Sequence, residues 1–197
     1  MIDRPPSHDQ TIEAIARCGV PASKIQIIYE EEIQTDTVSI DELSEAPSEA
    51  RMTCIYRATM PFGYHVRFAN ADQDGLFRNW AGAEARGWAR LEGRKWLQDR
   101  GLLDGVPTYS PDESDLSTFL SEVESYCSVE RGSALEVVND GFITLQAGFM
   151  QSIHGVPGPS ETFTCLTNVL AASNLAEAGI RFGFIAHGAI SEEGDSH

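Results

Sequence analysis

Hydrophobic and polar positions follow helical spacing near the start of the chain and strand spacing soon after it. Ile12 and Ile15 lie on one stripe, and Ser7 is placed to cap the first turn, so we predict a short amphipathic helix over residues 8–18. β-branched residues are dense over residues 25–40, which predicts one long strand or two short ones. The chain therefore starts with a helix followed by extended structure.

The middle of the chain combines two predicted strands with the longest predicted helix. The strands cover residues 53–58 and 64–69, separated by a turn that contains Pro and Gly. The helix covers residues 76–97, and each glycine inside it costs about 1 kcal/mol relative to alanine, so we expect it to depend on packing and to kink near Gly93. At 100° per residue this helix has an apolar face formed by Leu76, Phe77, Trp80, Trp88 and Leu91. Its opposite face is basic and is formed by Arg78, Arg86, Arg90 and Arg100.

Turn and capping residues divide the second half of the chain. The spacing predicts helices over residues 115–126 and 160–179, the second nearly uncharged and buried. Residues 139–141, Asn-Asp-Gly, accept positive φ values, so we predict a hairpin over residues 134–149. A last strand is expected over residues 180–190.

The order of these elements points to an α+β fold, with helices packed on one face of a mainly antiparallel sheet. We expect a single domain over residues 1–197, or one domain with a small N-terminal extension over residues 1–50, and a flexible tail over residues 191–197. No internal repeat is evident. The chain has 197 residues and is 42% hydrophobic, which is enough to bury a core.

Charge adds an asymmetry to this outline. The formal net charge is -16, yet nine of the fourteen Lys and Arg residues lie between Arg51 and Arg100, and both flanks are strongly acidic. A charge of this size repels itself in the compact state. We therefore expect the flanks either to neutralise the Arg-rich middle or to face a cationic partner. Repulsion by phosphates argues against direct binding to nucleic acid.

Several classes of protein are disfavoured by what the sequence lacks. No stretch approaches the roughly 18 apolar residues of a membrane span, and the first residues are unlike a signal peptide, so we expect a cytoplasmic protein that does not bind membranes. The four cysteines form no Cys-x-x-Cys pair, which disfavours a zinc site. We expect Cys18, Cys54, Cys127 and Cys165 to be reduced and mostly buried.

The best candidate for a metal site joins the predicted hairpin to the end of a predicted strand. Asp140 lies at the hairpin tip, and Asp72 and Asp74 follow the strand over residues 64–69; paired carboxylates of this kind bind Mg²⁺ with a nucleotide phosphate. Residues 137–142, Val-Val-Asn-Asp-Gly-Phe, loosely resemble the Gly-Asp-Gly-Phe hairpin of class III nucleotidyl cyclases. That resemblance, over about residues 64–190, implies a metal-dependent nucleotide-handling enzyme. Asn70 departs from its metal-binding pattern, and Asn-Asp-Gly is also a good turn.

Two other places contain candidate catalytic groups. Glu84 falls between Trp80 and Trp88 on the apolar face, where desolvation would suit a general acid, or where an arginine would pair with it. Cys165 near a helix N-terminus, with His187 on the following strand, supplies the parts of a thiolate pair, although a buried structural cysteine and a chance histidine are the favoured interpretation.

We conclude that an acidic interaction protein is the better hypothesis and an enzyme the weaker one. Inhibitors, immunity proteins and nucleic-acid mimics bind basic surfaces through clustered carboxylates, which speed encounter. Such a protein needs no cofactor, whereas the enzyme alternative implies Mg²⁺. The oligomeric state is left open. The carboxylates that we expect to face the partner are those of Glu30, Glu31, Glu32, Asp112, Glu113 and Asp115.

Overall fold

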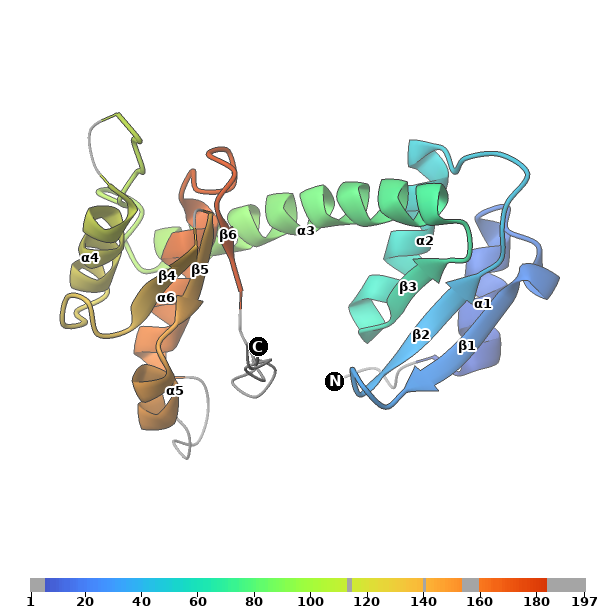
Figure 1. The fold of residues 1–197 in the computed structure, drawn as a ribbon, viewed down its shortest axis with the longest axis horizontal. Helices are drawn as coiled ribbons and strands as arrows, with labels where there is room; N and C mark the ends of the chain where they lie inside the picture. The colour runs from blue at the N-terminus through green and yellow to red at the C-terminus, as the bar shows by residue number, and fades with distance from the viewer. Residues whose placement is uncertain (1–5, 113–114, 140, 154–159, 184–197) are drawn as a thin grey trace, which may run out of the picture. The chain divides into compact units, whose positions relative to one another are not determined.

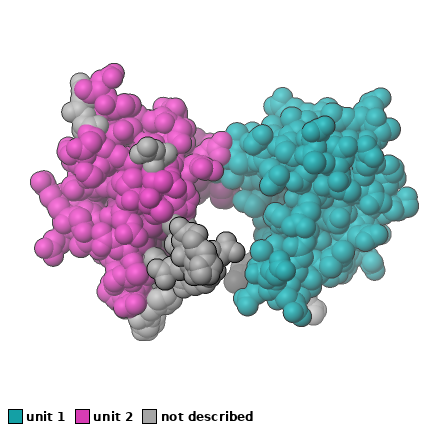
Figure 2. Space-filling model, in the orientation of Figure 1, with its two compact units in different colours: residues 1–85 teal, residues 86–197 magenta. Residues whose placement is uncertain are grey.

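The computed structural model describes residues 6–112, 115–139, 141–153 and 160–183 (Figure 1). Helices combine with two three-stranded sheets, which confirms the α+β class. The chain divides into two compact units, unit 1 over residues 1–85 and unit 2 over residues 86–197 (Figure 2). Helix α3 (Ala71–Asp99) contributes its first half to unit 1 and its second half to unit 2.

Unit 1 is built from a helix, a hairpin, a second helix and a strand. The central strand β2 pairs antiparallel with β1 and parallel with β3, and helix α2 makes the crossover between the two parallel strands. Its elements before α3 are α1 (His8–Arg17), the 3₁₀ turn η1 (Ala22–Lys24), β1 (Ile25–Glu30), β2 (Thr35–Ile40), α2 (Glu49–Thr59), the 3₁₀ turn η2 (Met60–Phe62) and β3 (His65–Phe68).

One face of the unit 1 sheet carries the core. The Ser7 hydroxyl accepts a hydrogen bond from the Gln10 backbone at 3.3 Å, and the Gln10 side chain accepts one from the Ser7 backbone at 2.9 Å, so a capping box starts α1. Helices α1 and α2 cover this face (Figure 1). The buried core comprises Ile15, Val20, Ile25, Val38, Ile40, Leu43, Met52, Ile55, Val66, Phe68 and Phe77.

Unit 2 has the same kind of sheet. Strand β5 pairs antiparallel with β4 and parallel with β6, and α6 lies in the crossover between β5 and β6. The Asp115 carboxylate accepts a hydrogen bond from the Thr118 backbone at 2.8 Å and caps α4. The elements after α3 are α4 (Leu116–Tyr126), β4 (Leu135–Asn139), β5 (Phe142–Leu145), α5 (Ala147–Ile153), α6 (Glu161–Ala172) and β6 (Arg181–Phe182).

The two units repeat one order of elements, and each contains one disulfide at the corresponding place. Cys18 ends α1 and is bonded to Cys54 in α2; Cys127 ends α4 and is bonded to Cys165 in α6. The paired cysteines are 36 and 38 residues apart. A glycine with positive φ lies two residues before the strand that ends each unit, Gly63 before β3 and Gly179 before β6. The units also share two short motifs. Cys-x-Val occurs at 18–20 and 127–129, and Thr-Cys-aliphatic occurs at 53–55 and 164–166.

These bonds correct two expectations. The cysteines are not reduced thiols: all four take part in disulfides. The sequence does contain an internal repeat of a small α-β-β-α-β module. The repeat is hard to recognise in the sequence because the two units share only a few cysteines and turn residues.

Two predicted elements in the middle of the chain also differ from the structure. Residues 53–58 are helical, within α2, because Ser48 caps this segment and Met52 and Ile55 face the core at helical spacing. Helix α3 is continuous through Gly93. Phe77 is buried, but Leu76, Trp88 and Leu91 are exposed, because each half of α3 buries its own positions and the helix has no single apolar stripe.

Candidate functional site

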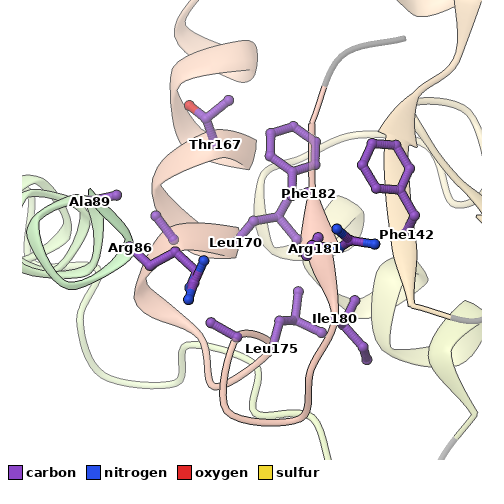
Figure 3. Close-up of a pocket in the computed structure, with 11 residues that line it drawn as sticks. Arg86, Ala89, Phe142, Thr167, Leu170, Leu175, Ile180, Arg181 and Phe182 are labelled. Carbon is purple, nitrogen blue, oxygen red and sulfur yellow. The ribbon is translucent and has the colours of Figure 1, made fainter. Parts of the chain in front are cut away.

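Unit 2 contains a groove that is one of several concave sites among the described residues. It lies between the second half of α3, α6 and β6, and its volume is about 340 Å³ (Figure 3). The lining is mostly apolar, with a threonine and two arginines. Its residues are Arg86, Ala89, Phe142, Thr167, Leu170, Ala171, Leu175, Ala176, Ile180, Arg181 and Phe182.

The two arginines give this groove a positive charge. Arg86 extends from α3 toward the groove, and Arg181 lies on β6 beside Phe142 (Figure 3). Among the described residues neither guanidinium forms an ion pair with a carboxylate, whereas Arg90, one turn after Arg86 on α3, is paired with Glu177.

Unit 1 has a groove at the corresponding place, between α2, β3 and the first half of α3, with a volume of about 250 Å³. The correspondence extends to single positions. Tyr56 and Thr167 each lie two residues after the disulfide cysteine, and His65 and Arg181 each begin the last strand of their unit. The lining residues are Tyr56, Thr59, Met60, Tyr64, His65, Val66, Phe77, Arg78, Ala81, Gly82 and Ala85.

The charges of the two grooves differ. In the unit 1 groove, Arg78 is neutralised by Asp74, whose carboxylate is 2.9 Å from the guanidinium. Burial raises the pKa of the Tyr56 hydroxyl, and the negative charge of Glu84 raises it further. The unit 1 groove thus has a paired arginine and a carboxylate nearby, whereas the two arginines of the unit 2 groove form no ion pair with a carboxylate in the part of the chain that the structure describes.

The candidate catalytic residues do not form a site. Cys165 is bonded to Cys127, so it is not a thiolate, and His187 lies outside the described residues. Glu84 is exposed on α3 and therefore is not desolvated between the tryptophans. Neither catalytic role has the environment it requires, whereas Cys165 is the buried structural cysteine that the favoured interpretation predicted.

The metal candidates belong to different units. Asp72 is exposed, and Asp74 accepts a hydrogen bond from the Phe68 backbone at 2.9 Å as well as pairing with Arg78. Both lie in the first turn of α3, directly after β3 of the unit 1 sheet, whereas the hairpin of β4 and β5 belongs to the sheet of unit 2. The strands next to the candidates are therefore not neighbours in one sheet, and Asp140 itself lies outside the described residues. Among the described residues no three acidic, His or Cys side chains form a group that could hold a metal ion.

The predicted acidic binding residues have different roles. Glu31, Glu32 and Asp112 are exposed, and Glu113 lies outside the described residues. Glu30 is only 26% exposed and pairs with Arg67 at 3.5 Å across β2. Asp115 caps α4, and hydrogen bonds from the Ser117 side chain and the Thr118 backbone lower the pKa of its carboxyl group. Glu30 and Asp115 thus act within the fold.

Beside the exposed glutamates, the β1–β2 hairpin carries large apolar side chains in solvent. Ile28, Tyr29 and Ile33 are 51%, 58% and 48% exposed. We refer to residues 28–33 as the hairpin tip. It combines exposed apolar side chains with the carboxylates of Glu31 and Glu32, and because Ile28 and Tyr29 are neighbours on β1, their side chains lie on opposite faces of the strand.

The grooves were also missed from the sequence. Arg181 offered a signal, because it is one of only two basic residues after residue 104 and interrupts an otherwise apolar segment. Arg86 could not be distinguished from the other arginines of α3, since its role depends on α6 and β6 lying beside it.

Comparison of the chain with protein-family models, with curated proteins and with solved structures finds no match. No helix among the described residues has the length and apolar character needed to cross a membrane.

Proposed function

We propose that this chain is an interaction protein that binds a basic protein through the hairpin tip, and that it is not an enzyme. The observation that supports the proposal is the composition of the tip: Ile28, Tyr29 and Ile33 are each about half exposed, next to the exposed carboxylates of Glu31 and Glu32. Protein interfaces commonly have an apolar centre with a polar rim, and aromatic residues contribute much of the binding energy.

Charge complementarity identifies the kind of partner. The rim of the tip is acidic, so a surface rich in Lys and Arg is attracted once it comes within a Debye length, about 8 Å at physiological ionic strength. A second copy of the chain would bring like charges together, which disfavours self-association through this surface. The apolar side chains favour a protein partner over simple imitation of nucleic-acid charge.

The disulfides bear on where the protein works. Structural disulfides persist in oxidising compartments and are rare in the cytosol, where thiols are kept reduced. Because both units contain one, we propose maturation in an oxidising compartment in place of the cytoplasmic location expected from the sequence.

The test captures partners from lysate with the immobilised, disulfide-intact chain and follows association at low and high salt. Tyr29→Ser/Ile33→Ser removes the apolar centre, and we expect affinity for the captured basic protein to fall at least about thirtyfold, as for an interface hot spot. Glu31→Gln/Glu32→Gln removes the rim charge. Its association should be slower at low salt and approach the original rate at high salt, since the Debye length shortens to about 3 Å at 1 M.

Glu13→Gln/Glu45→Gln is the matched control, because it makes the same charge change at two exposed residues of unit 1 outside the tip. Full affinity in Tyr29→Ser/Ile33→Ser would exclude the tip. An equal loss of rate in the control would show that only net charge matters. Turnover of a nucleoside triphosphate with Mg²⁺ that Asp140→Asn abolishes would establish the enzyme alternative in place of this proposal.

A further inference from the structure

We propose that the groove of unit 2 binds a small amphipathic carboxylate, with an apolar body between α3, α6 and β6 and its carboxylate at Arg86, while Arg181 on the β6 side of the groove adds positive charge. This is a separate site from the hairpin tip. It concerns a small molecule and does not depend on the proposed protein partner.

The size and lining of the groove set the apolar part of the ligand. A volume of about 340 Å³ is within the range of small-molecule sites, roughly 300–1,000 Å³. Leu170, Leu175 and Ile180 are buried core residues whose side chains form its walls (Figure 3). Thr167 adds a hydroxyl, so most of a bound molecule would contact hydrocarbon.

The arginines set the polar part. A guanidinium offers a planar set of donors that matches a carboxylate, and such charge-assisted hydrogen bonds are about twice as strong as neutral ones. Because neither Arg86 nor Arg181 is paired with a carboxylate among the described residues, an incoming anion displaces no internal partner. The net charge of -16 opposes anions in general, but charges more than about 8 Å away are largely screened at physiological ionic strength.

The corresponding groove of unit 1 serves as an internal reference. It has a similar location and a volume of about 250 Å³, but Arg78 is already paired with Asp74, and Glu84 is close enough to raise the pKa of Tyr56. A carboxylate should therefore bind in unit 2 and not in unit 1.

The experiment titrates the full disulfide-bonded chain with decanoate and follows methyl groups by NMR. We expect saturable shifts at Leu170, Leu175 and Ile180, with Val66 and Ala81 of the unit 1 groove unchanged. Decanol, which has the same apolar chain without the charge, should bind at least about tenfold more weakly. Binding of decanoate should also weaken in acid as its carboxylate is protonated.

Variants test the arginines and the apolar walls of the groove separately. Arg86→Gln and Arg181→Gln should each weaken decanoate binding roughly tenfold, while Arg94→Gln, an exposed arginine of α3 that does not line the groove, should leave it unchanged. Ala89→Phe keeps every charge and fills the groove from an exposed helical position, so it should abolish binding. The proposal is overturned if decanoate gives no saturable shifts, if decanol binds equally well, or if Arg94→Gln weakens binding as much as Arg86→Gln.

Discussion

At the scale of single residues, Glu124 shows how a carboxylate can organise a loop from inside the core. Its side chain is fully buried on α4 and accepts hydrogen bonds from the backbones of Gly132, Ala134 and Leu135, the last two at 2.8 and 2.9 Å. These three amides lie at the entry to β4, where no sheet partner is available to them. Glu124 therefore joins the first helix of unit 2 to its hairpin.

We predict that Glu124→Gln lowers the free energy of unfolding by about 2 kcal/mol. The amide group replaces one acceptor oxygen with a donor, so either the Gly132 N–H or the buried N–H groups of Ala134 and Leu135 lose their acceptor, at a cost of about 1–3 kcal/mol. Glu122→Gln, an exposed change on the same helix, should stay within about 0.5 kcal/mol of the original chain. Urea denaturation followed by circular dichroism measures both, and equal stability of the two variants would contradict the role of Glu124.

At the scale of elements, the contact between α3 and α6 depends on a glycine. A Cβ atom built at Gly93 would lie 2.7 Å from the carbonyl oxygen of Asn168 and 3.3 Å from the Cβ of Ala171. The two backbones approach this closely only because Gly93 has no side chain. Gly87, also in α3, has nothing within 4 Å of the same position.

The two glycines should respond to alanine in opposite directions. Gly87→Ala should stabilise the chain by up to about 1 kcal/mol, because alanine is the better helix former and meets no neighbour. Gly93→Ala gains the same propensity but forces α6 away, and overpacking costs about 1–3 kcal/mol, so we expect a net loss. Thermal unfolding of the two variants tests this; a higher melting temperature for Gly93→Ala would mean that the helices are not in close contact.

The accuracy of element prediction followed the strength of local signals. The first helix, the β4–β5 hairpin and the start of the helix after Ser160 were predicted because a capping residue type or an Asn-Asp-Gly turn marks them, but residues 147–149 of the predicted hairpin belong to α5, and α6 ends at Ala172, before the predicted end at residue 179. Residues 53–58 were predicted as a strand because Thr, Ile and Tyr favour strands in isolation. Packing of Met52 and Ile55 into the core overrode that preference.

At the scale of the whole molecule, the repeated module escaped prediction together with its disulfides. Each unit positions its groove with the same three parts: a disulfide-bonded helix, a last strand that follows a left-handed glycine, and a segment of α3. Sequence patterns do not show which of these helices and strands pack against one another, because such packing is tertiary structure. The acidic character was evident from composition, but which carboxylates are exposed and which act as caps or ion-pair partners depends on tertiary structure.

Removing either disulfide should destabilise its own unit. The loops that the bonds close span 36 and 38 residues, for which the chain-entropy treatment gives about 4 kcal/mol each. We predict that Cys18→Ala/Cys54→Ala reduces amide protection against hydrogen exchange in unit 1 and that Cys127→Ala/Cys165→Ala reduces it in unit 2. Equal losses in both units from one pair of substitutions would show that the units unfold together.

The placement of the two disulfides also affects how the chain acquires them. Four cysteines allow three pairings, and here the native pairing joins the first to the second and the third to the fourth. A chain that enters an oxidising compartment with its N-terminus first exposes Cys18 and Cys54 before either competing thiol has arrived. If they bond at once, Cys127 meets only Cys165 as a thiol partner. The order of synthesis alone then selects the correct bonds, without the reshuffling that interleaved disulfides require.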